Sequence, residues 1–202
     1  MLYHLTAREN VERIQDSRRL ESTALLMEAA DEHSNPRVRR TGTLPLSVGP
    51  HRIQIRDQAP LYAGHIEFEG GWGLGELVQD LNRRVFFWPG WEHKPIPSGE
   101  NYFKRYRSER PAILRLRFDS LRRHNQGHIP LFCKFNSGAP SSYPGRRSPR
   151  GPATFLPAHE CPYVPSAVVE VTFLDWVTLP PDTEVSADLE DGWDALFTEQ
   201  QE

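Results

Sequence analysis

Apolar residues two positions apart predict a series of short strands along this 202-residue chain. Alternate residues of a strand face the same side of a sheet, so this spacing is typical of a half-buried sheet. The clearest run is Ala-Val-Val-Glu-Val-Thr-Phe at 167–173, which residues 176–179 would extend. The other predicted strands cover residues 2–6, 51–55, 84–88, 111–118 and 131–135.

Apolar residues three and four positions apart predict helices between these strands. The pattern is clearest over residues 74–82, where four apolar side chains share one face: Leu74, Leu77, Val78 and Leu81. A longer helix is predicted over 7–20, with Thr6 or Asn10 suited to cap its start. The remaining helical predictions are residues 22–30 and 189–197, a fragment at 102–107, and a turn or short helix at 119–123.

Two stretches rich in Pro, Gly, Ser and Arg, residues 31–50 and 136–165, are predicted to be loops. The second is too long for a simple connector, and loops of that length are usually functional lids or disordered. Short strands with irregular connectors indicate an α+β fold with a mostly antiparallel or mixed sheet. The length suits a single domain over residues 1–180, followed by an acidic tail over 181–202.

The position of the charges along the chain is more informative than the net charge. The formal net charge of −3 argues against a general nucleic-acid binder, which is usually basic overall. The acids gather after residue 181, however, and the 24 basic residues comprise 21 Arg and 3 Lys, so the body of the chain is basic. Arginine binds planar anions in a bidentate fork, which favours a phosphate-bearing ligand. A GC-rich genome would explain the same arginine content equally well.

Several classes of protein are not indicated by the sequence. Two cysteines without a C-x-x-C pair give no disulfide framework, and the eight scattered histidines give no metal-binding pattern. The chain carries no P-loop, G-x-G-x-x-G, G-x-S-x-G or H-E-x-x-H sequence. No apolar run approaches the roughly 20 residues of a membrane helix, and the first residues do not resemble a signal peptide. We therefore expect a soluble, cytoplasmic protein.

Three features are candidates for chemistry. His4 and Thr6 share one face of the first strand, although a strand histidine is more often structural. The aromatic run at 86–88 ends another strand, where a ring would stack on a planar heterocycle or simply fill the core. Glu170 interrupts an apolar strand, and such a carboxylate must face solvent, meet an arginine or line a cleft.

Taken together, these features resemble the ADP-ribosyltransferase superfamily. Its members have a split, mostly antiparallel sheet with flanking helices, and NAD lies in a cleft between the two halves. Tyr3-His4-Leu5-Thr6 matches the element that holds the nicotinamide ribose and amide in that superfamily. The stretch from residue 2 to residue 14, including Asn10, is similar to the DarT branch, which modifies DNA bases.

The resemblance also implies roles for later residues. Glu170 stands where a late strand carries the catalytic glutamate. Phe87 or Trp88 stands against the nicotinamide, where many members have Tyr. Arg56 would hold the NAD phosphates, with Arg39 or Arg40 as alternatives.

Most of the chain is more similar to an uncharacterised bacterial family in or beside this superfamily. The elements that carry this likeness are Ile-Arg-Asp-Gln at 55–58, Leu-Asn-Arg-Arg-Val-Phe-Phe-Trp at 81–88, Asn-Ser-Gly at 136–138 and Pro-Arg-Gly-Pro-Ala-Thr-Phe at 149–155. That family implies no particular activity.

The resemblance to the superfamily implies an enzyme that uses NAD as a substrate and modifies a macromolecule, with nucleic acid favoured over protein. Arg146, Arg147 and Arg150, beside Tyr143, would contact a nucleic-acid backbone and one exposed base. Such an enzyme would act as a toxin or defence effector, and an antitoxin would be a possible partner. Two alternatives are a non-catalytic NAD- or RNA-binding module of the same fold and an NAD-dependent RNA 2′-phosphotransferase.

Overall fold

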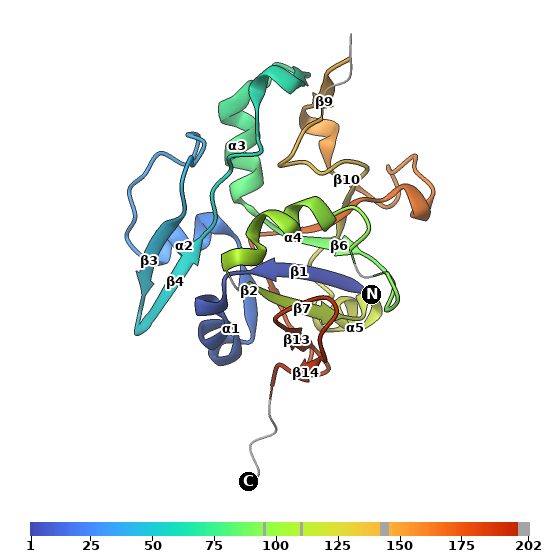
Figure 1. Cartoon of the computed structure of the whole chain (residues 1–202). Coiled ribbons are helices and arrows are strands. Elements are labelled where there is room, and N and C mark those ends of the chain that lie inside the picture. Colours follow the sequence, from blue (N-terminus) through green and yellow to red (C-terminus); the bar gives the residue numbers. More distant parts are fainter. Residues whose placement is uncertain (95, 110, 142–145, 198–202) are drawn as a thin grey trace.

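An eight-stranded antiparallel sheet lies at the centre of the molecule (Figure 1). The structure is a computed structural model, which describes residues 1–94, 96–109, 111–141 and 146–197. The strand order is β10-β8-β11-β6-β1-β7-β13-β14. Their bounds are β1 Leu2–Thr6, β6 Arg84–Pro89, β7 Ala112–Leu116, β8 Leu131–Cys133, β10 Leu156–Pro157, β11 Glu170–Leu174, β13 Glu184–Ser186 and β14 Asp194–Ala195. Together with the helices, this sheet confirms the predicted α+β class.

Three two-stranded sheets surround the central one. β2 (Arg19–Glu21) pairs with β12 (Trp176–Thr178), and β3 (Leu44–Val48) forms a hairpin with β4 (His51–Ile55). The third sheet is parallel and joins β5 (Ile66–Phe68) to β9 (Ser148–Arg150). The β3–β4 hairpin extends beside the central sheet, at the left of Figure 1.

Within the described residues, five helices flank the sheets: α1 Val11–Ser17, α2 Thr23–Ala29, α3 Leu74–Asn82, α4 Glu100–Tyr106 and α5 Phe118–His124. Short 3₁₀ segments lie at Arg8–Asn10, Ala63–His65, Arg107–Glu109, Pro152–Thr154 and Pro165–Ala167. Leu121 of α5 joins the main core with Leu114 and Phe173, whereas Phe103 of α4 packs in a second cluster with Tyr3. Among the described residues, no helix is long and apolar enough to cross a membrane.

The central sheet is split between β1 and β6. These two strands pair only at Leu2–Pro89 and Tyr3–Trp88. Farther along, β1 continues to pair with β7 and β6 with β11, so the two halves diverge. Backbone groups along the inner edges of the divergence need other partners, because a buried unpaired peptide group is costly.

Several predicted elements are confirmed. The strands at 2–6 and 51–55 and the helix at 74–82 have the predicted bounds, and the strand at 84–88 extends by one residue. The predictions near 22–30, 102–107, 111–118, 131–135 and 167–173 are confirmed with shorter or shifted bounds, and the short helix at 119–123 is one residue longer at each end.

Two predictions near the N-terminus are wrong in part. The helix predicted over 7–20 ends at Ser17, because Arg18 adopts a left-handed conformation with φ of 53° and the chain then enters β2. The loop predicted over 31–50 from its Pro- and Gly-rich composition contains β3, in which Leu44, Leu46 and Val48 alternate with Pro45 and Ser47. Proline is tolerated in a strand that has a free edge, and β3 pairs only with β4.

The helix predicted over 189–197 is wrong. The chain instead forms β13 and β14, which extend the central sheet as far as Ala195. Leu196 is fully buried in the main core, and Trp193 packs against Tyr3. Between β13 and β14 the chain bends at residues 187–191, and the Gly192 carbonyl accepts a hydrogen bond from the Ser186 hydroxyl at 2.8 Å. Residues 181–197 are therefore part of the fold rather than a solvated tail.

Gly151 marks a close approach between the end of β9 and the residue after β5. A Cβ at this position would lie 2.8 Å from the carbonyl oxygen of Glu69 and 3.1 Å from its carbonyl carbon. The Glu69 amide also donates to the carbonyl of Arg150 at 2.9 Å, which fixes the two segments together.

We expect Gly151→Ala to lower the free energy of unfolding by about 1–3 kcal/mol, since backbone must move to admit the methyl group. Gly127→Ala is the matched control, because a Cβ there meets nothing within 4 Å. Chemical denaturation of both variants checks this expectation. Equal stability of the two variants would contradict the close approach.

Candidate active site

A cavity of about 240 Å³ opens at the split between β1 and β6. Five of the six residues predicted to form the site line it: His4, Thr6, Asn10, Arg56 and Glu170. Further polar or aromatic residues on its wall are Arg40, Asp57, Gln58, Asn82, Arg84, Phe86, Trp88, Tyr102, Asn136 and Ser137. Three of the four sequence elements that suggested the uncharacterised family contribute residues to this wall, those at 55–58, 81–88 and 136–138. The fourth, at 149–155, contacts the wall through Arg150, which donates to the carbonyls of Asn136 and Ser137.

Glu170 is the first residue of β11 and is 5 % exposed. Its Oε1 accepts a hydrogen bond from the backbone N–H of Ser137 at 3.1 Å, whereas its Oε2 has no partner among the described residues. The Ser137 hydroxyl, which is also buried, has no hydrogen-bond partner either. Two buried oxygens of cavity-lining residues therefore lack a partner within the described chain.

Burial raises the pKa of the Glu170 carboxyl to about 7. The Ser137 hydroxyl and N–H and the positive charges of Arg150 and Arg84 oppose this effect, but desolvation dominates. The hydroxyl acts through its proximity, without the geometry of a hydrogen bond. A carboxyl with a pKa near neutrality can both hold and release a proton at physiological pH.

His4 closes part of the gap between the diverging strands. Its Nδ1 lies 2.9 Å from the carbonyl oxygen of Phe86 on β6. A carbonyl only accepts, so Nδ1 carries the proton. Burial lowers the pKa of the imidazole to about 4, and the ring is neutral at pH 7. His4 thus offers the lone pair of Nε2 as an acceptor, and no described residue occupies it.

Arg56 follows β4 and reaches back to β1. Its Nη2 donates to the carbonyl of Thr6 at 2.9 Å, and its guanidinium lies 4.6 Å from the ring centre of Tyr106. The buried Nε and Nη1 atoms have no hydrogen-bond partner in the described chain. Burial lowers the pKa of this guanidinium. Nε and Nη1 lie on different edges of the guanidinium, so this buried cation keeps two separate donors, each suited to an anionic oxygen.

Asn10 and Thr6 position this cation. Nδ2 of Asn10 donates to Oγ1 of Thr6 and to the carbonyl of Gln54, and its Oδ1 accepts from the Gln54 amide. These bonds use the capacity of the Asn10 side chain and fasten β4 to the end of β1. Asn10 therefore lines the cavity mainly as a support for Arg56.

The two alternative arginines differ from Arg56. Arg40 lines the cavity, but its guanidinium donates to Asn82 Oδ1 at 2.8 Å and to the carbonyl of Arg56 at 3.2 Å. Arg39 donates to the carbonyls of Ala59 and Leu61 and does not line the cavity. Both guanidinium groups therefore donate hydrogen bonds to oxygens of the protein itself.

Phe87 is placed wrongly by the sequence prediction. Its ring is fully buried in the main core, where it packs edge-on against Phe173, and it does not line the cavity. Its neighbours Phe86 and Trp88 do line the cavity, because alternate residues of β6 face opposite sides. Trp88 and Tyr102, with ring centres 5.5 Å apart, form an aromatic wall.

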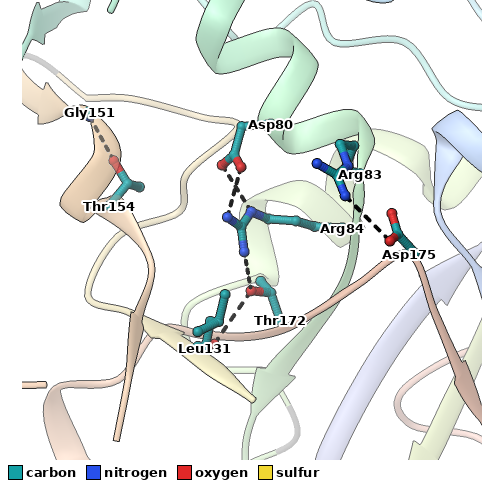
Figure 2. A network of polar contacts seen from close by, with 8 residues as sticks. All are labelled: Asp80, Arg83, Arg84, Leu131, Gly151, Thr154, Thr172 and Asp175. Carbon is teal, nitrogen blue, oxygen red and sulfur yellow. Dashed lines mark hydrogen bonds and ion pairs between the residues drawn. The ribbon is translucent and has the colours of Figure 1, made fainter. Parts of the chain in front are cut away.

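Arg84 fixes the strand that carries Glu170 to α3. Figure 2 shows its guanidinium facing both carboxylate oxygens of Asp80, at 2.9 and 2.8 Å. A third contact reaches Oγ1 of Thr172 at 3.4 Å, two residues beyond Glu170. The guanidinium also lies 4.0 Å from the ring centre of Phe155. Asp80 neutralises Arg84, so this charge supports the site rather than offering a free anion site.

The residues that sequence reasoning missed at this site lie on irregular chain. Ser137 and Asn136 line the cavity, and Nε1 of Trp88 donates to Asn136 Oδ1 at 3.1 Å. The signal was present, since Asn-Ser-Gly at 136–138 is one of the family-like elements. Arg150, which we expected to contact nucleic acid, is 1 % exposed and unavailable to it. Tyr143 lies outside the described residues.

No group of three or more His, Cys, Asp or Glu side chains in the described part of the chain has an arrangement that would hold a metal ion. A family model described as a family of unknown function (DUF7002) matches residues 1–181, and the chain belongs to this family. No curated protein and no solved structure matches the chain.

We expect Glu170→Gln to stabilise the protein at pH 8 and to have little effect near pH 4.5. The carboxyl pKa is raised from 4.5 to about 7, so the stability from burying the protonated form is complete below pH 4.5. That stability is lost as the pH rises towards 7, and the loss amounts to about 3 kcal/mol by linkage. The amide keeps the shape and cannot ionise, so it escapes this loss.

Urea unfolding of the two proteins at pH 4.5 and pH 8 measures the difference. If the difference in the free energy of unfolding between variant and wild type does not change with pH, then ionisation of Glu170 costs the folded protein no stability.

Proposed function

We propose that this protein is an ADP-ribosyltransferase, which uses NAD as a substrate and transfers ADP-ribose to a macromolecule. The observation that carries the proposal is the placement of Glu170, with its unpartnered Oε2, in one cavity with His4 and Arg56. The cavity lies at the split of an antiparallel sheet, where the resemblance to the superfamily leads us to expect NAD.

Each incompletely bonded group fits one part of NAD. Nε and Nη1 of Arg56 suit two oxygens of the pyrophosphate. The neutral His4 suits a ribose hydroxyl or the carboxamide N–H as an acceptor. The aromatic wall of Trp88 and Tyr102 suits the flat, positively charged nicotinamide ring.

The chemistry follows from this arrangement. The bond between the ribose carbon and the nicotinamide nitrogen breaks, and its electron pair neutralises the ring. Positive charge then develops on the ribose, and the Glu170 carboxylate stabilises that charge. The acceptor nucleophile bonds to the same carbon, and its proton passes to Glu170. Both roles need the ionised carboxyl, so activity rises with pH through about 7.

We propose nucleic acid rather than protein as the acceptor class. Arg146 and Arg147 are exposed, and they lie eight or nine residues after Gly138 on the cavity wall. Exposed arginines would bind phosphates of a nucleic-acid backbone and bring a base towards the ribose. The likeness of the first strand to the DarT branch supports the same choice.

Incubation with labelled NAD and separate pools of DNA, RNA and cell protein tests the proposed function. We expect label in a nucleic-acid pool with the wild type, and a loss of at least a hundredfold with Glu170→Gln, which keeps shape but has no negative charge. Thermal unfolding of the variant confirms that it is folded.

The pools separate the alternatives. Label in the protein pool would overturn the choice of acceptor and leave the enzyme. Binding of NAD without label in any pool would favour a non-catalytic module, and absence of NAD binding would refute the proposed function.

Arg56→Lys tests the proposed phosphate contact. A lysine ammonium cannot donate to the Thr6 carbonyl and also offer two further donors in fixed directions, so we expect NAD and ADP-ribose to bind at least tenfold more weakly while nicotinamide binding is unchanged. Isothermal titration measures all three ligands. Arg52→Lys, an exposed position on β4, the strand that Arg56 follows, is the matched control. Equal weakening of nicotinamide would show that Arg56 acts on the fold instead.

A further inference from the structure

Arg150 is a buried arginine that contacts no carboxylate in the described chain. It is 1 % exposed, and its guanidinium lies 4.5 Å from the ring centre of Phe135. Nε donates to the carbonyl of Ser137 at 3.3 Å, and Nη2 donates to the carbonyl of Asn136 at 3.0 Å. Nη1 donates to Oγ of Ser148 and to the carbonyl of Pro149, both at 2.7 Å.

The two carbonyls at 136 and 137 belong to the turn that touches Glu170. The N–H of Ser137 points to Glu170 Oε1, while its carbonyl points to Arg150. The Asn136 side chain holds the same turn from the other side, since it accepts from Trp88 and donates to the carbonyl of Ser98 at 2.7 Å. The direction of the Ser137 N–H therefore depends on how its own carbonyl and the preceding one are held.

We propose that Arg150 is a positioning residue, which holds the 136–138 turn so that the Ser137 N–H and the guanidinium charge together keep Glu170 oriented and able to ionise. The consequence for catalysis rests on the proposed function, whereas the effect on the carboxyl does not.

The backbone at Arg150 is itself held rigidly, which a positioning residue requires. β9 pairs with β5 at Arg150 and Phe68, and the Glu69 amide donates to the Arg150 carbonyl. Gly151 allows this close contact, since a Cβ there would meet the Glu69 carbonyl. The family-like elements at 136–138 and 149–155 thus form one unit behind the cavity, one supplying the turn and the other the arginine.

The electrostatic effect has a definite sign. Arg150 carries a positive charge in the same buried region as Glu170, and that charge lowers the pKa of the carboxyl against the dominant effect of burial. A hydrogen bond from an N–H to the charged form acts in the same direction. Removing Arg150 weakens both, so the pKa of Glu170 must rise.

The test is a ¹³C NMR titration of the glutamate carboxyl carbons, in which Glu170 is identified by the signal that Glu170→Gln lacks. We expect Arg150→Met to raise the pKa of Glu170 by about one, and to speed amide exchange at Ser137 at least tenfold. Arg147→Met, the same change at an exposed neighbour, should alter neither. If the wild type transfers ADP-ribose, the pH profile of kcat/KM should move upwards by the same amount in Arg150→Met.

An unchanged Glu170 pKa in a folded Arg150→Met protein would overturn the proposal. Should that variant not fold, Arg150→Lys keeps the charge but cannot span both carbonyls, and we expect faster Ser137 exchange with a smaller pKa rise. In the wild type, the Arg150 Nε–H and the Ser137 N–H should exchange through one common opening, and independent exchange would also overturn the proposal. None of these carboxyl and exchange measurements involves NAD, so absence of transfer would refute only the proposed function.

Discussion

Burial of the Glu170 carboxyl is the constraint around which this part of the fold is arranged. The residue begins a strand whose next three positions are all buried, and a charged carboxyl among them is costly. An ion pair would remove much of that cost, but no arginine or lysine of the described chain contacts the carboxyl directly. The structure instead supplies one backbone N–H, from Ser137, and two arginines at longer range. This partial compensation leaves the pKa near neutrality rather than at either extreme.

The arginines of the body illustrate how composition misleads when it is read for ligands. Arg150, Arg39 and Arg40 mainly donate to carbonyl or amide oxygens of the protein, and Arg84 forms a bidentate pair with Asp80. These residues join irregular segments that make few regular backbone hydrogen bonds, which is a structural use of the guanidinium. Arginine content alone therefore gives no measure of phosphate binding. The distinction lies in which donors the protein itself leaves without a partner, and Arg56 has two of them.

Sequence periodicity predicted the central strands as short apolar runs. Burial alternates along most of β6, whereas nearly every residue of β7 and β11 is buried. The same alternation should have separated Phe87 from Phe86 and Trp88, and the choice of Phe87 was an error of reasoning rather than of information. β3 and the C-terminal strands were missed for another reason. The strands with which they pair are set by tertiary contacts. In addition, the spacing of a few apolar residues near Pro45 or Gly192 is compatible with more than one local structure. The role of Ser137 depends on a hydrogen bond across 33 residues of chain, which no local pattern encodes.

The distribution of unsatisfied polar atoms argues that the cavity is a ligand site and more than a packing defect. Six buried side-chain polar atoms lack a partner in the described chain, and four of them belong to cavity-lining residues: Arg56 Nε and Nη1, Ser137 Oγ and Glu170 Oε2. A folded protein normally pairs such groups, since each one left unpaired costs free energy. Here the cation and the carboxyl are held by separate elements, the hairpin through Asn10 and the turn through Arg150. Two separate supports for a cation and a carboxyl in one cavity fit the proposed ligand, NAD, which carries an anionic pyrophosphate and a positively charged nicotinamide.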